Sequence, residues 1–148
     1  MEINNRIRKQ VMSDLESGIK AQGQSMIALF CNGTPTVLQA PDPSYPEQPC
    51  DLPAIAIALA EGQSISDDFD EETWRASLIV RIYLVVDNKL DPQLDAIGQQ
   101  VRNVLHRGYT ADGLLTLCNI AAYDYARDDD SPWGTLDLIF TVEYNEET

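Results

Sequence analysis

The sequence predicts a single α+β domain spanning residues 1–148, in which two main helices pack on a mixed, mostly antiparallel β-sheet. Two observations predict this class: some segments repeat apolar residues at helical spacing, and others alternate apolar and polar residues as strands do. A chain of 148 residues has the size of one ordinary domain, and its hydrophobic fraction of 44% is typical of globular proteins. No internal repeat or composition break indicates a second domain.

The first element expected is an amphipathic helix that begins near Ile3 and ends near Gly23. Its apolar residues recur at intervals of four and therefore gather on one side: Ile7, Val11, Leu15 and Ile19. A β-hairpin is expected next, because the apolar runs 26–30 and 36–38 flank Asn32-Gly33, a pair that accepts the positive φ angles of a tight turn.

A proline-rich loop and a strand are expected to follow. Five of the eight prolines fall between residues 41 and 53, where missing amide donors and a fixed φ exclude regular structure. From Ala54 to Ala60, branched residues alternate with alanines, which predicts a strand with one buried and one closely covered face. The acidic stretch 66–72 is then expected to be an exposed loop.

The most regular segment runs from Trp74 to Val86 and predicts the central strand of the sheet. Every second residue from Trp74 is apolar, opposite a face that carries Arg75 and Arg81. A helix is expected to start at Asp91-Pro92, an N-cap followed by proline, and to stop at Gly108. Two final strands, 120–125 and 136–144, are joined by a polar loop.

Composition argues against several classes of function. The net charge is −14, from 24 acidic and 10 basic residues, so the summed field repels nucleic acid and anionic membranes. The polar start does not resemble a signal peptide and no stretch approaches a membrane span, so we expect the protein to stay where it is made. Reduced thiols are expected rather than a zinc site, because the relevant residues are few and widely spaced: Cys31, Cys50, Cys118 and His106.

The chemical motifs are mostly negative. Acidic residues in the stretches 67–72 and 128–130 could hold a divalent cation, but neither stretch has the basic neighbours that a nuclease needs for phosphate. An EF-hand is excluded because the first stretch lacks its glycine. His106 is expected to complement a helix dipole rather than to act as a base. The residues alone therefore predict an acidic α+β binding or assembly domain, without catalytic residues or cofactors.

One specific sequence motif, at residues 123–130, resembles a known protein family. The stretch Tyr-Asp-Tyr-Ala-Arg-Asp-Asp-Asp at 123–130, followed by Trp133 and a strand that ends near Tyr144, resembles the C-terminal end of the lambda-type minor tail protein U family. Supporting segments in the same order are 30–33, 52–57, 70–84 and 94–96, so the resemblance covers nearly the whole chain. The proline-rich loop is longer than in the family, and the lead into Trp133 differs.

The resemblance implies a non-enzymatic phage tail terminator. Such a protein forms a hexameric ring on the head-proximal end of the tail tube, stops its polymerisation and provides the surface for head joining. The partners implied are further copies of the chain, the tail tube protein and a head-completion or connector protein. The implied location is the host cytoplasm during assembly and then the virion tail.

Candidate interface residues follow from the resemblance and from the charge pattern. The acidic turn with its flanking aromatics is the first candidate: Arg127, Asp128, Asp129, Asp130, Tyr123, Tyr125 and Trp133. A second candidate patch is Asp67, Asp68 and Asp70. Alternatively, Arg127 pairs with a local aspartate in a solvated turn, and the aromatics belong to the core. Because a ring brings acidic copies together, we expect a weak divalent-cation effect on assembly.

Two rival functions are considered. A head-completion or neck protein of a long-tailed phage would share the size, the acidity and the ring-forming habit, but it would bind the portal side rather than the tube. A cation-dependent enzyme would cleave nucleic acid with magnesium or manganese.

Overall fold

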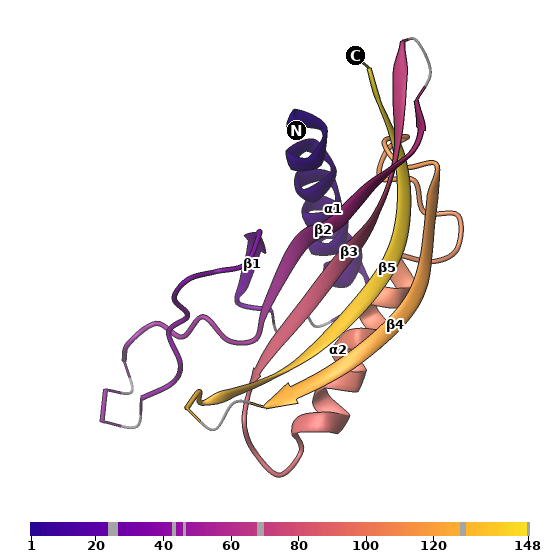
Figure 1. Ribbon diagram of the computed structural model, residues 1–148. Helices are drawn as coiled ribbons and strands as arrows, with labels where there is room; N and C mark the ends of the chain where they lie inside the picture. Colours follow the sequence, from indigo (N-terminus) through magenta and orange to yellow (C-terminus); the bar gives the residue numbers. More distant parts are fainter. Residues whose placement is uncertain (24–26, 43, 46, 68–69, 128–129, 148) are drawn as a thin grey trace.

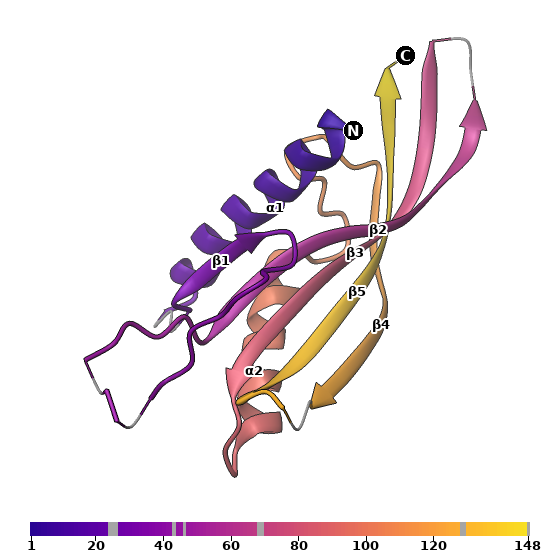
Figure 2. The same ribbon diagram turned by 60° about the vertical axis from the view of Figure 1, so that its left-hand side comes forward.

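The computed structural model describes residues 1–148 apart from 24–26, 43, 46, 68–69, 128–129, 148 and the side chain of Asp67. The predicted α+β class is confirmed, because two helices lie on one face of a five-stranded mixed sheet (Figures 1 and 2) within the described residues. The elements are α1 (Glu2–Ala21), β1 (Leu29–Asn32), β2 (Ala54–Asp67), β3 (Glu71–Val85), α2 (Leu90–Val104), β4 (Leu117–Arg127) and β5 (Trp133–Glu147).

The sheet order is β1-β2-β3-β5-β4. β1 runs parallel to β2, and the other neighbouring pairs are antiparallel. The predicted central position of β3 is confirmed: it pairs with β2 on one side and with β5 on the other, over nearly its whole length. Its alternate residues Ala76, Leu78, Val80 and Ile82 are buried under the helices, as the period of two predicts.

The first helix has the predicted buried stripe, in which Ile7, Val11, Leu15 and Ile19 are fully buried. The predicted start of the second helix is two residues too late, and its predicted cap is wrong. α2 begins at Leu90 with Lys89 at the N-cap position and no side-chain cap hydrogen bond. Asp87, not Asp91, fixes the entry, since its carboxylate accepts a 2.7 Å hydrogen bond from the Lys89 amide. Pro92 lies in the first turn, where no intrahelical donor is needed.

The predicted hairpin at Asn32-Gly33 is wrong. Gly33 does adopt a positive φ of 94°, but its amide donates to the carbonyl of Ile57 at 2.7 Å. The short β1 therefore joins β2 in parallel, and the chain leaves the sheet instead of folding back, with no strand in the segment 36–38. The Asn-Gly pair permits a turn, but longer-range pairing with β2 determines the strand partner.

β2 continues well beyond the predicted strand at 54–60. It reaches Asp67, with register shifts between Ala60 and Gln63 and between Ser64 and Ser66. The acidic stretch 66–72, expected to be a loop, is therefore largely strand, and its tip joins two long strands that project beyond the helices (Figure 1). Polar residues can extend a strand here because both faces of this arm are open to water.

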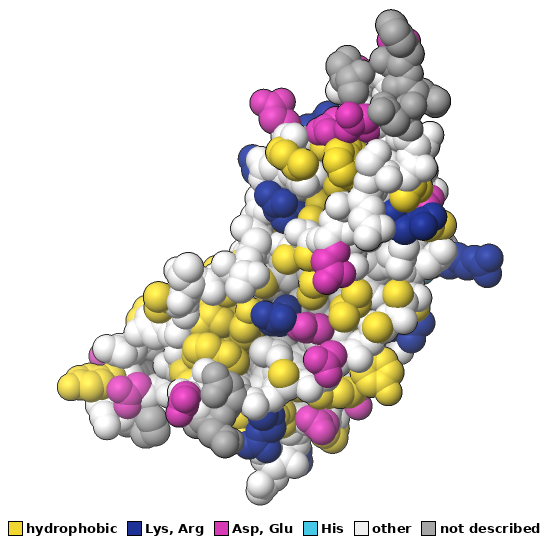
Figure 3. Space-filling view, in the orientation of Figure 1, with side chains coloured by type: hydrophobic (Ala, Val, Ile, Leu, Met, Phe, Trp, Pro, Cys, Tyr) yellow, Lys and Arg dark blue, Asp and Glu magenta, His cyan; other side chains and the backbone are white. Residues whose placement is uncertain are grey.

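The opposite face of the sheet carries a smaller apolar cluster and rows of charged side chains. The predicted proline-rich loop lacks regular structure in its described residues, and Leu38 and Leu52 from this region pack on Ala54, Ala56 and Tyr83. This contact accounts for the predicted close covering of the alanine face of β2. Further along the face, apolar and oppositely charged side chains lie side by side (Figure 3).

Neither helix combines the length and the hydropathy that would let it cross a membrane, among the residues described. The three cysteines are free thiols. Burial raises the pKa of the Cys118 thiol to about 11, and burial followed by the nearby Asp51 carboxylate raises that of Cys31. Thiols with a raised pKa hold less of the reactive thiolate.

Candidate assembly interface

β4 presents an open, amphipathic edge. Its residues from Asn119 to Arg127 are all exposed, although their β5 partners alternate between buried and half-buried. Ile120, Tyr123 and Tyr125 pair with Phe140, Leu138 and Leu136, so they stand on the face that carries the helices. α2 covers β5 but stops short of these three side chains, which are 40%, 68% and 41% exposed.

The two tyrosines form a pair on this edge. Their rings meet edge to face, with centroids 5.7 Å apart and an interplanar angle of 79°. The Tyr125 hydroxyl donates a hydrogen bond to Asp95 on α2. This hydrogen bond, with smaller contributions from burial and nearby negative charge, raises the pKa of Tyr125 to about 12. Rigid, amphipathic aromatics with a fixed hydroxyl are typical anchors of protein interfaces.

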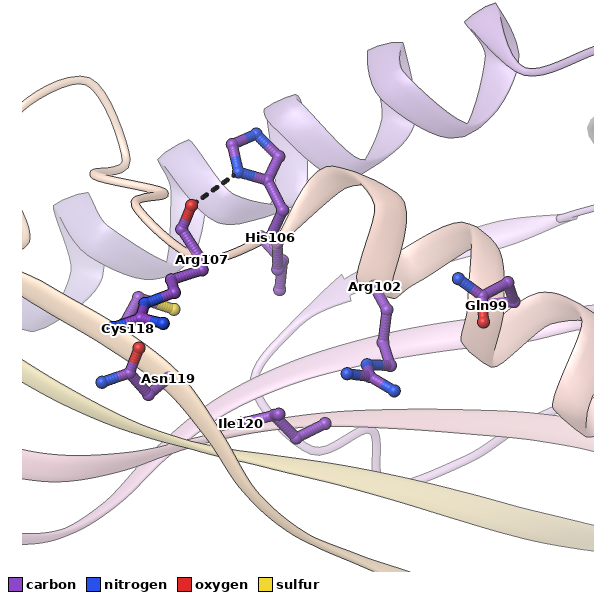
Figure 4. A pocket seen from close by; sticks show the side chains of 8 residues that line it. Gln99, Arg102, His106, Arg107, Cys118, Asn119 and Ile120 are labelled. Carbon is purple, nitrogen blue, oxygen red and sulfur yellow. Dashed lines mark hydrogen bonds between the residues drawn. The ribbon is translucent and has the colours of Figure 1, made fainter.

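A basic pocket adjoins this edge between the end of α2 and the start of β4. Figure 4 shows Arg102 reaching from α2 toward Ile120, and His106 and Arg107 above Cys118 and Asn119. The His106 Nδ1 lies 3.0 Å from the carbonyl oxygen of Arg107. In a protein with a net charge of −14, such a concentration of basic side chains favours an acidic partner. No local sequence pattern predicts this pocket, because its residues come from separate elements.

Arg127 ends β4 opposite Gly134, on the same alternation as Tyr123 and Tyr125. Asp130 is exposed in the turn that follows. Asp128 and Asp129 lie outside the described residues. Arg127 therefore lies on the same face of β4 as the two tyrosines. The role of the acidic turn in assembly stays a prediction.

Trp133 does not join the tyrosines. It starts β5 on the other face of the sheet, where its ring meets that of Tyr83 edge to face at 6.3 Å. Trp133 is half-buried and packs on the smaller apolar cluster. Of the aromatics grouped by sequence around the acidic turn, Trp133 therefore contributes mainly to packing.

The second predicted acidic patch lies far from the first. Asp67 ends β2, Asp70 is exposed just before β3, and Asp68 lies outside the described residues. Both views place the β2–β3 turn and the β4–β5 turn at opposite ends of the sheet (Figures 1 and 2). The two patches can thus contact different partners, and a single subunit does not bring them together.

Two ion pairs join β3 to β5 on the helix-free face. Arg81 donates from Nε and Nη2 to the two oxygens of Asp137 at 2.6 and 2.8 Å. Arg75 directs both donors to one oxygen of Glu143, at 3.0 and 2.6 Å. The hydrogen bonds to Asp137 raise the pKa of Arg81 above its ordinary range. Within the described residues, no group of three or more His, Cys, Asp or Glu side chains is placed to hold a metal ion.

The chain resembles known tail proteins over most of its length. A family described as phage minor tail protein U matches residues 2–144. The tail tube terminator protein of Escherichia phage N15 is 31% identical over 94% of this chain and 96% of its own length. The tail tube terminator protein of Escherichia phage lambda is 28% identical over 79% of this chain and 83% of its own length.

A solved structure supports the fold alone. A chain from the virion of a native gene transfer agent particle superposes with a TM-score of 0.55 at 11% identity, covering 92% of this chain and 98% of that chain. With the fold matched and the family sequence aligned from the first helix to the last strand, the chain belongs to the phage minor tail protein U family.

Proposed function

We propose that this protein terminates the tail tube of a long-tailed phage by capping it. The observation that carries the proposal is the similarity, over nearly the whole chain, to two proteins named tail tube terminators. The protein acts by contact rather than by catalysis. Its location is then the head-proximal end of the virion tail, after assembly in the host cytoplasm.

The cap is a hexameric ring. One ring face complements the last ring of tube subunits, and the other lacks the surface that a further tube subunit would need. That second face instead binds a head-completion or connector protein. A heterologous ring closes on itself, whereas a tube is an open-ended stack, and this difference stops polymerisation.

The test is deletion of the reading frame from the phage that carries it, followed by electron microscopy of the tails. Overlong tails that regain normal length when the protein is supplied would support the proposal. Tails of normal length that fail to join heads would instead identify a head-completion protein. Cleavage of nucleic acid by the purified protein with magnesium or manganese would contradict a purely structural role; we expect none.

The acidic β4–β5 turn contributes to contacts between subunits or toward the tube, through Arg127, Asp128, Asp129 and Asp130. The exposed Tyr123 and Tyr125 flank it and support this assignment. We expect the double variant Asp128→Ala with Asp130→Ala to be a folded monomer that no longer limits tail length. Normal rings and normal tails from this variant would contradict the assignment.

Divalent cations weakly favour closure of the ring. Copies that each carry a net charge of −14 repel one another, and bound cations reduce that repulsion. Light scattering of the purified protein across a magnesium titration is the measurement. A shift from monomer toward hexamer supports cation control, whereas an unchanged monomer implies that the tube end templates the ring.

A further inference from the structure

The sheet has two open edges that face away from each other. β1 pairs with β2 only from Ala54 to Ile57, where the Gly33 amide makes the last hydrogen bond. From Ala58 to Ser66, no described strand pairs with the side of β2 that faces away from β3. On the other side of the sheet, β4 likewise has no described strand beyond it. Each subunit thus exposes about ten residues of unpaired strand at either edge.

Both edge strands carry exposed large apolar side chains, one on β2 and three on β4 among the described residues. Ile65 on β2 is 39% exposed, and Ile120, Tyr123 and Tyr125 line β4. A long edge strand with exposed apolar residues is a template for another strand, and proteins normally cover or charge such an edge. Two edges of this kind in one subunit indicate a partner that covers both.

We propose that the β4 edge of one copy pairs with the Ala58–Asp67 edge of β2 in a second copy, so that neighbouring sheets become continuous. The strand directions permit it. β2, β3, β5 and β4 are successively antiparallel, so β4 runs opposite to β2. Copies placed head to tail therefore keep antiparallel pairing across each junction. The inference rests on the proposed ring, since two different edges form a heterologous interface.

The register gives a reasonable geometry for such a ring. Ala122 lies level with Ala58 through Ile139 and Ile79, so the middle of β4 faces the start of the open β2 edge. To centre one edge on the other, a neighbour must shift along the strands by about four residues, at ~3.3 Å per residue. Across four strands ~4.8 Å apart, this shift tilts the strands by about 35°, within the ~35–45° of closed barrels.

The charges of the two edges are complementary after that shift. It moves the start of β4, with the basic pocket of Arg102, His106 and Arg107, toward the far end of the neighbour's β2. That end carries acidic residues, among them the exposed Asp70 and Glu71. Attraction between a basic pocket and an acidic hairpin selects this pairing over pairing of two like edges.

The test disrupts pairing at one edge at a time, by substituting exposed residues on the edge strands. Tyr123→Asp adds a negative charge to the β4 edge where it would face the acidic β2 edge, and Ile65→Asp adds one to the β2 edge. Matched controls place aspartate at exposed positions away from both edges: Tyr45→Asp repeats the tyrosine change, and Val37→Asp replaces another β-branched apolar residue. Circular dichroism and thermal unfolding check that each variant is folded, and light scattering with magnesium and tail tubes measures assembly.

We expect either edge variant alone to stay monomeric and the controls to assemble like the wild type. An equal mixture of the two edge variants should form heterodimers and stop there, because each retains the edge that the other has lost. Rings from either variant alone, or a mixture that stays monomeric, would overturn the pairing while leaving the ring proposal intact. A wild-type protein that never assembles would overturn both.

Discussion

β4 and β5 are neighbouring antiparallel strands with similar amphipathic patterns, yet β4 joins the core only at its start, through Cys118, whereas β5 joins it along most of its length. Leu136, Leu138 and Phe140 of β5 are buried, whereas their partners on β4 are exposed. The difference lies in what covers them. α2 packs on β3 and β5, where Gly98 allows close approach, and leaves β4 exposed from Asn119 to Arg127.

This contrast separates stability from assembly. β5 should contribute to the stability of the fold through the apolar surface that it buries within the subunit. β4 has apolar side chains and unpaired backbone that a second copy can cover, so its residues should affect assembly more than folding. Substitutions at paired positions of the two strands can test this division.

The largest effect is expected from Phe140→Ala, because Phe140 is 1% exposed. Removing the ring leaves a cavity and should lower the free energy of unfolding by about 3–5 kcal/mol. Its cross-strand partner supplies the control: Ile120→Ala should change that free energy by less than ~1 kcal/mol. Urea unfolding measures both. Similar losses at the two positions would mean that β4 belongs to the core.

A smaller effect is expected where α2 rests on β5. A Cβ added at Gly98 would lie 3.0 Å from Leu136 Cδ2, with Ile82 and Leu138 nearby. Gly98→Val should therefore overpack the contact and cost about 1–3 kcal/mol, although valine favours a helix more than glycine does. Thermal unfolding provides the measurement, with Ala96→Val on the exposed side of α2 as control. Equal stability of the two variants would show that close approach is not needed.

Much of the fold could be predicted because its strongest patterns are local. The stripe of α1 and the alternation of β3 and β5 determine their buried faces, and the structure has them as predicted. The Asn32-Gly33 turn and the start of α2 were predicted wrongly because longer-range contacts decided them. β1 pairs with β2 in parallel, and Asp87 rather than Asp91 binds the backbone at the helix start.

The candidate site could be predicted only in part. Alternation correctly put Tyr123 and Tyr125 on one face, but it could not tell whether a helix covers that face. Proximity in sequence groups Trp133 with them, but Trp133 lies on the opposite face of the sheet against Tyr83. The basic pocket and the open β2 edge depend on how separate elements meet, which no local pattern encodes.

On the helix-free face, the two ion pairs between β3 and β5 should contribute modestly and unequally. A double-mutant cycle of Arg81→Ala and Asp137→Ala should give a coupling of about 0.5–1 kcal/mol, since the guanidinium engages both carboxylate oxygens in a half-buried setting. The same cycle for Arg75 and Glu143 should give less, because Arg75 is more exposed and uses one oxygen. Added salt should reduce both couplings; couplings that are equal and insensitive to salt would contradict this account.

The smallest effect on stability is expected at Tyr125 on the β4 edge. Its pKa is raised to about 12 by the hydrogen bond to Asp95, so above the ordinary tyrosine pKa of ~10 the unfolded chain loses this proton more readily than the folded one. The contribution is therefore fully present below the ordinary pKa and is lost as the pH rises through the folded value. Tyr125→Phe should leave the urea midpoint nearly unchanged at neutral pH and flatten its alkaline decline slightly.

The control for this variant is Asp95→Asn, which keeps an acceptor but removes the charge. It should move the pKa of Tyr125 back toward the ordinary value, as followed by ultraviolet absorbance of the phenolate. The pKa values of Tyr109 and Tyr144 are raised too, in their case mainly by burial. The titration of Tyr125 must therefore be taken from the difference in absorbance between wild type and variant. Tyr125→Phe could instead lower the urea midpoint at neutral pH as much as a core substitution does. The hydroxyl would then be needed to hold α2 against β4, and β4 would contribute to the stability of the fold as β5 does, which would contradict the proposed division.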